Sequence, residues 1–199
     1  YTLIRLPDDC AVMILGDVSG KGIEAASMSA LVKTALTAYA WEGAGPARMA
    51  RSLNSILMGF SRVETFVTAF IAKIDLKAGR ATYCSAGHPP TMVIRPESMP
   101  LGGGEARGGE VELLGCQSGV IGAFESMVYE TGVFTFAPGD MLFMYTDGTI
   151  EARDRAAHRL HAEHERGKAE QDHAGVLFLV VLAEHVVDDA DERKDGSEG

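Results

Sequence analysis

The first apolar stretches of the chain are typical of two strands joined by a turn. Residues 1–6 and 10–15 are rich in Leu, Ile and Val, and the turn-favouring residues Pro7, Asp8 and Asp9 lie between them. This pattern predicts a β-hairpin at the start of the chain.

The spacing of apolar residues then changes to that of a helix, after a glycine-bearing segment. From Ile23 to Tyr39 apolar side chains recur every three or four positions, which places them on one face. Gly43 and Gly45 end this helix, and Pro46, a residue favoured at the first helical position, opens a second one. The sequence therefore predicts two consecutive helices.

The middle of the chain is rich in short segments typical of strands. The predicted strands are 65–76, 80–85, 91–95, 111–114, 128–136 and 141–145. Residues 97–110 carry five glycines and no periodicity, which predicts a flexible surface loop. Two strands, two helices and about six further strands predict an α+β fold, with antiparallel sheets and the helices packed outside them.

The last part of the chain allows two interpretations. Apolar residues between 176 and 190 match one face of a helix, whereas residues 176–182 alone would equally suit a buried strand. A tail helix is the preferred prediction. Residues 188–199 are acidic and predict a solvated end, and the whole chain, 1–199, is expected to form one domain.

Composition and charge exclude some classes of function. The chain is 46% hydrophobic and carries a formal net charge of −10, which argues against non-specific binding of nucleic acid, because that relies on clustered Lys and Arg. Its longest apolar run, 176–183, is far shorter than the roughly 20 residues of a membrane-spanning helix. Cys10, Cys84 and Cys116 are widely spaced and lack a zinc or redox motif, which suits a reducing, cytoplasmic location.

Two aspartates directly follow predicted strands. Asp17 comes after the apolar run 12–15, and Asp147 comes after 141–145. Carboxylates at strand ends hold hard divalent cations, and two of them on neighbouring strands could bind two metals and activate a water for phosphoryl transfer. The alternative for each is structural: Asp17 would cap the following helix, and Asp147 would cap a turn or helix.

Other candidates carry weaker signals. The segment from Gly16 to Lys21 lacks the spacing and the hydroxyl residue of a nucleotide-binding loop. His88 lies in a Gly-His-Pro-Pro corner and would be either structural or directed at a site. His158, His161 and His164 lie among charged residues and predict a solvated surface rather than a metal site.

A combination of motifs is more specific than any of them alone. In order along the chain these are LGDVSGKG (15–22), TFVTAF (65–70), AGHPP (86–90), PGD (138–140) and YTDGTIEAR (145–153). Together they resemble the SpoIIE/RsbU branch of the metal-dependent PPM protein phosphatases. The resemblance implies a β-sandwich flanked by helices, with two Mn²⁺ or Mg²⁺ ions at one end. It also implies hydrolysis of phosphoserine or phosphothreonine on a protein substrate, typically a STAS-domain anti-anti-sigma factor of a bacterial partner-switching pathway.

The resemblance also implies roles for individual residues. Asp17 would bridge both metals, Val18 would offer its backbone carbonyl, and Asp147 would be a further ligand, so Asp17 and Asp147 are the expected catalytic residues. The helix at 23–39 would communicate with an upstream sensor or regulatory domain, which would precede Tyr1.

Three departures from the family pattern qualify this picture. The family's first metal-associated Asp would lie before Tyr1, and its closing Asp-Asp pair, which leads into a final strand, has only a poorly spaced counterpart at 172–175, so we expect a domain truncated at both ends. Ser19 stands where other PPM relatives carry a histidine proposed as general acid, which leaves His88 or a metal-bound water as candidates. The alternative function is a PPM fold that has lost a ligand and acts as a regulatory docking module.

Overall fold

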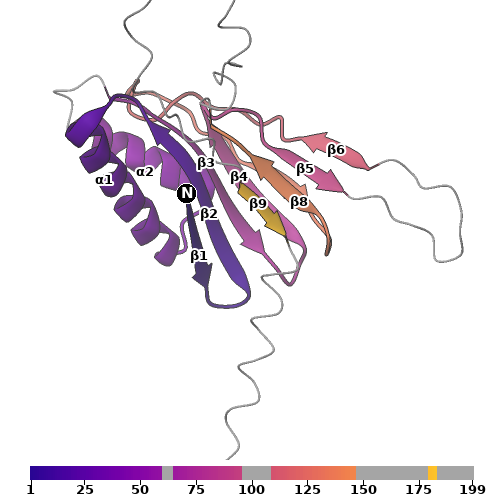
Figure 1. Ribbon diagram of the computed structural model, residues 1–199. Coiled ribbons are helices and arrows are strands. Elements are labelled where there is room, and N and C mark those ends of the chain that lie inside the picture. The colour runs from indigo at the N-terminus through magenta and orange to yellow at the C-terminus, as the bar shows by residue number, and fades with distance from the viewer. Residues whose placement is uncertain (60–64, 96–108, 147–178, 183–199) are drawn as a thin grey trace, which may run out of the picture.

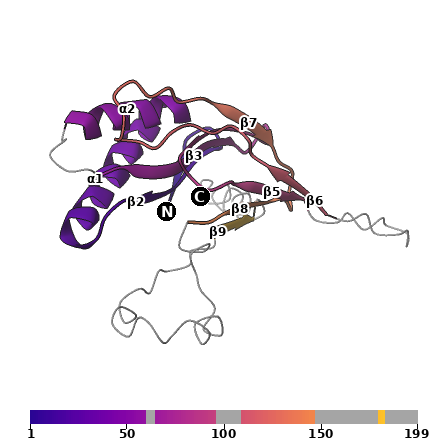
Figure 2. The same ribbon diagram turned by 90° about the horizontal axis from the view of Figure 1, so that it is seen from above.

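Two antiparallel sheets face one another, and two helices cover the outer side of one of them (Figures 1 and 2). The computed structural model describes residues 1–59, 65–95, 109–146 and 179–182. This arrangement confirms the predicted α+β class. No helix in these parts of the chain combines the length and the apolar character that crossing a membrane requires.

The first sheet has five strands in the order β1-β2-β3-β4-β7. Their bounds are β1 Thr2–Leu6, β2 Cys10–Val18, β3 Val67–Asp75, β4 Arg80–Ala86 and β7 Gly132–Thr135. The predicted hairpin is confirmed as β1 and β2, with Asp8 and Asp9 of its turn at φ values of 59° and 53°. β2 continues past Leu15, so Asp17 lies inside this strand rather than after it.

The second sheet has four strands in the order β6-β5-β8-β9. Their bounds are β5 Met92–Arg95, β6 Glu110–Leu113, β8 Met141–Met144 and β9 Leu179–Leu182. The preferred tail helix is wrong for 179–182, which pairs antiparallel with β8 instead. A short run containing two valines suits a strand once a free sheet edge is available, and periodicity alone does not reveal that edge.

The helices are α1, Gly22–Trp41, and α2, Pro46–Gly59, close to the predicted bounds. Alternate residues of β2 divide the interior into two layers. Val12 and Ile14 pack beneath the helices, whereas Met13 and Leu15 face the second sheet.

The strand predicted at 128–136 is much shorter than expected, because its first residues are bound elsewhere. Tyr129 is buried in the layer beneath the helices, and the Glu130 N–H donates a hydrogen bond to the Ser118 hydroxyl oxygen. Only Gly132–Thr135 pairs with β4. The segment 114–131 therefore wraps over the ends of β3 and β4.

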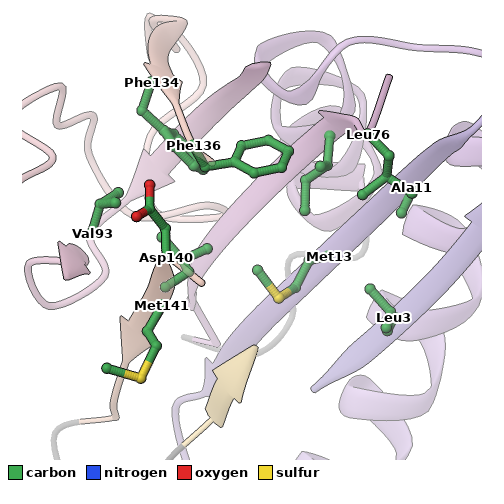
Figure 3. A pocket seen from close by; sticks show the side chains of 11 residues that line it. Leu3, Ala11, Met13, Leu76, Val93, Phe134, Phe136, Asp140 and Met141 are labelled. Carbon is green, nitrogen blue, oxygen red and sulfur yellow. The ribbon is translucent and has the colours of Figure 1, made fainter. Parts of the chain in front are cut away.

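β2 and β8 run in the same direction in facing sheets. An apolar cavity at one end of the sandwich is lined by Ala11 at the start of β2, Leu76 just after β3, and Met141 at the start of β8 (Figure 3). Both strands lead away from this cavity, so their last residues lie toward the opposite end. This end holds the candidate site.

Candidate metal centre

Asp17 lies at the open end of the space between the sheets. It pairs with Thr68 across β2 and β3, is exposed, and falls on the same face of β2 as Met13 and Leu15. The cap of α1 is Lys21, which makes no side-chain capping bond, so the helix-cap alternative for Asp17 is wrong. Its exposed carboxylate is therefore a candidate cation ligand.

The backbone carbonyl of Val18 faces away from β3. Val67, opposite Val18, exchanges both of its backbone hydrogen bonds with Ile121 on its other side, at 2.8 Å each. In an antiparallel pair this makes Val18 and Val67 a non-hydrogen-bonded pair, so the Val18 carbonyl points outward. β1 pairs with β2 only as far as Ile14, so no described strand lies beside Val18 on that side.

Ser19 fastens the turn after β2 to the start of β3. Its N–H donates to the Phe66 carbonyl at 2.9 Å, and its hydroxyl oxygen accepts from the Phe66 N–H at 2.9 Å. Gly20 and Gly22 follow with φ values of 109° and 81°, which favour glycine strongly. This turn holds the strand end that carries Asp17 and Val18.

Asp147 lies outside the described residues, which reach Thr146 in this part of the chain. β8 and β2 belong to different sheets, so the two strands are not adjacent in one sheet. They face each other across the sandwich instead. Because both strands end at the same end of the sandwich, a meeting of the two aspartates stays a prediction.

His88 is part of the interior rather than of the exposed site. It is only 4% exposed, and its ring centroid lies 6.4 Å from that of Phe70, a fully buried residue between the sheets. Gly87 beside it has a φ of 63° and packs against Val120. These contacts favour the structural interpretation. His158, His161 and His164 lie outside the described residues.

One thiol and one phenol in the core beneath the helices are held in their neutral forms by burial. Burial raises the pKa of Cys84 to about 11 and that of Tyr129 to about 12. A thiol with so high a pKa is a poor nucleophile at neutral pH. Cys84 is therefore a core residue rather than a catalytic one.

The oxygen donors at the end of β2 fit a hard cation. A carboxylate and a backbone carbonyl are ligands that Mg²⁺ and Mn²⁺ accept, whereas zinc favours sulfur and imidazole. Within the described ranges, no three His, Cys, Asp or Glu side chains gather closely enough to hold a metal ion. A metal ion bound at Asp17 and Val18 would therefore need further ligands from outside these ranges.

The sequence matches one family model and several curated proteins. The model describes stage II sporulation protein E (SpoIIE) and matches residues 7–198. The chain is 27% identical over 139 residues to phosphoserine phosphatase RsbU of Bacillus subtilis, covering 70% of this chain and 38% of that protein. It is 25% identical over 143 residues to phosphoserine phosphatase RsbP of the same organism, covering 70% of this chain and 33% of RsbP.

Solved structures share the fold. The RsbU and RsbW domains of a Mycobacterium tuberculosis protein align with a TM-score of 0.61 and 26% identity, over 80% of this chain and 42% of that one. RsbX in complex with magnesium aligns with a TM-score of 0.58 and 23% identity, over 79% of this chain and 70% of that one. The PP2C phosphatase domain of SpoIIE from Bacillus subtilis aligns with a TM-score of 0.60 and 19% identity, over 81% of this chain and 44% of that one.

Proposed function

The chain belongs to the SpoIIE family, and from this premise we propose that it is a metal-dependent protein phosphatase acting on phosphoserine or phosphothreonine. The chain spans only 38% and 33% of the two curated phosphoserine phosphatases that it matches. A phosphatase activity of this chain is therefore proposed rather than taken over from them. Water would supply the oxygen that bonds to phosphorus while the serine or threonine Oγ–P bond breaks, giving inorganic phosphate and the free hydroxyl.

The observation that carries the proposal is the position of Asp17. It lies on the inter-sheet face of β2, beside the outward-facing Val18 carbonyl, at the end of the sandwich where β8 also ends. The motif that follows β8 contains Asp147. An exposed carboxylate, a carbonyl and a second acidic segment at one end of a sandwich suit a pair of hard cations.

Each residue of the proposed site has a separate role. Asp17 would hold two Mn²⁺ or Mg²⁺ ions with its carboxylate, Val18 would contribute its carbonyl, and Asp147 would add a further carboxylate. Ser19 keeps the turn beside them in place through its two bonds to Phe66. The bound ions would supply a Lewis acid and an activated water.

The proposed substrate is a phosphorylated STAS-domain protein of a bacterial partner-switching pathway. Support comes from the two relatives named phosphoserine phosphatases, which are 27% and 25% identical to this chain. An upstream sensor domain in a longer form of the protein is part of the same proposal.

The test is Mn²⁺-dependent release of phosphate from a phosphorylated STAS-domain protein. Asp17→Ala and Asp147→Ala should each lower turnover by about 100-fold or more, because even outer-shell changes at metal sites cost about 10- to 100-fold. Glu24→Ala, which removes an exposed acid in the first turn of α1, is the matched control and should keep its activity.

Two results would contradict the proposal. A folded Asp17→Ala protein with near-normal turnover would remove Asp17 from the metal site. An unaltered protein that binds the phosphoprotein but releases no phosphate with Mn²⁺ or Mg²⁺ would favour the regulatory docking module instead.

A further inference from the structure

Asn54 is a buried polar residue in an otherwise apolar face of α2. It is 3% exposed, and the neighbouring Leu53 and Leu57 belong to the core beneath the helices. A buried amide is costly unless its polar atoms are bonded. The hydrogen-bond partners of Asn54 therefore indicate its structural role.

All of its described side-chain partners lie in the segment 114–131. The Asn54 Oδ1 atom accepts from the Gly122 N–H at 2.7 Å and from the Tyr129 hydroxyl at 3.1 Å. Its Nδ2 atom donates to the Phe124 carbonyl at 3.0 Å. One side chain on α2 thus holds three points of the segment.

The held segment is joined to the start of β3. Ile121, next to Gly122, exchanges two backbone hydrogen bonds of 2.8 Å with Val67 and is fully buried. Gly122 has a φ of 90°, and a Cβ atom there would lie 3.2 Å from the Thr65 carbonyl oxygen. The position of the segment therefore fixes that of the first residues of β3.

The first residues of β3 in turn hold the candidate metal ligands. Phe66 is bonded twice to Ser19, and Thr68 pairs with Asp17. Val67, between them, faces Val18. From Asn54 the contacts thus pass through Ile121 and Val67 to the strand end that carries Asp17 and Val18.

We propose that Asn54 is a positioning residue for the metal site: it fixes the segment around Gly122 and, through Ile121 and Val67, the placement of Asp17 and Val18. This inference rests on the proposed function. Two of the three hydrogen bonds of Asn54 go to backbone groups. An apolar residue of similar volume would therefore fill the space but leave the Gly122 N–H without its acceptor.

The first experiment measures Mn²⁺ binding by calorimetry, not activity, in three variants. Asn54→Leu removes all three bonds and should weaken binding by about 10- to 100-fold, the range for residues that orient metal ligands. Asn54→Asp keeps an acceptor for Gly122 and should bind Mn²⁺ more tightly than Asn54→Leu. Tyr129→Phe removes only one of the three bonds of Asn54, together with the contact of the hydroxyl with the Val120 carbonyl, and should have the smallest effect.

A control separates positioning from general destabilisation. Leu53→Ala opens a cavity in the same helix but keeps the bonds of Asn54 to Gly122 and Phe124, and it should leave Mn²⁺ affinity unchanged in the folded protein. Amide hydrogen exchange gives a second readout: the Val67 and Ile121 amides should exchange faster in Asn54→Leu, but not in Leu53→Ala.

The outcomes distinguish this inference from the proposed function. Wild-type Mn²⁺ affinity in folded Asn54→Leu, or an equal loss in Leu53→Ala, would overturn the positioning role while leaving the metal site intact. If Asn54→Leu does not fold, Asn54→Ala, which also removes all three bonds, is measured in its place, and unchanged affinity and exchange in that variant would overturn the role equally. Absence of Mn²⁺ binding by the unaltered protein would contradict the proposed function itself.

Discussion

Gly16 and Thr68 approach so closely that a methyl group on Gly16 would stand 2.9 Å from the Thr68 carbonyl oxygen. Real Cβ atoms essentially never come this near, and the opposing atom belongs to the backbone, so it cannot turn aside. The contact lies immediately before Asp17. The close approach of β2 and β3 thus requires a glycine at position 16. The next residue, Asp17, is the proposed ligand.

Gly16→Ala should therefore impair the metal site without removing a ligand. The added methyl would push β2 away from β3, at a cost of about 1–3 kcal/mol for overpacking, and should weaken Mn²⁺ binding. Gly115→Ala is the matched control, since a Cβ there meets no atom within 4 Å. Denaturant unfolding and Mn²⁺ titration of both variants check the prediction, and equal behaviour of the two would refute it.

Ser19→Ala should separate a structural role from a proton-transfer role. Loss of the bond from the Phe66 N–H should lower the free energy of unfolding by about 0.5–1.5 kcal/mol. The shape of the pH–rate profile should stay the same, because we assign Ser19 no proton transfer. Ser55→Ala, which removes an exposed helical serine bonded to the Arg51 carbonyl, is the control. A lost limb of the profile in Ser19→Ala would show that the hydroxyl takes part in catalysis.

Leu31→Asp tests whether the packing of α1 affects the metal site. Leu31 packs partly buried against the core, and α1 begins only a few residues after Val18. A charge there should disturb the seating of the helix and weaken Mn²⁺ binding, although no ligand is altered. Ala30→Asp places the same charge on the exposed side as a control. Unchanged affinity and turnover in folded Leu31→Asp would count against the coupling.

Stability should fall at alkaline pH partly because of Tyr129. Burial raises its pKa from 10.0 to about 12, so between these values the unfolded chain releases a proton that the folded protein keeps. The contribution is complete below pH 10 and is lost as the pH rises toward 12. Urea unfolding at a series of pH values should show a shallower loss in Tyr129→Phe than in the unaltered protein. Identical slopes would mean that Tyr129 does not titrate in this way.

The sequence was most informative where the determinants are local. The hairpin turn at Asp8 and Asp9, the helix opening at Pro46 and the strand β4 follow from neighbouring residues and were predicted closely. β9 was not, because an apolar run of this length becomes a strand only when a partner edge exists, and that edge belongs to β8, far away in sequence.

In the candidate site, too, residues with local determinants were predicted, and those that depend on distant contacts were not. Asp17 was identified from its motif, but its place inside β2 depends on pairing with β3. Asn54 was missed, although a polar residue between Leu53 and Leu57 in an apolar helix face is a signal that could have been used. Its partners lie near residue 122, and no spacing along the chain connects them to α2.

The late position of β9 in the chain has a consequence for folding during synthesis. β1 to β4 and both helices lie within the first 86 residues and pair mostly with near neighbours, so this layer can form while the rest is still being translated. β8 gains its outer partner only after residue 179 has left the ribosome. Until then its edge is a template for pairing with another chain. A stop codon between β8 and β9 should therefore yield a protein that aggregates, even though the strand bearing Asp17 is already in place.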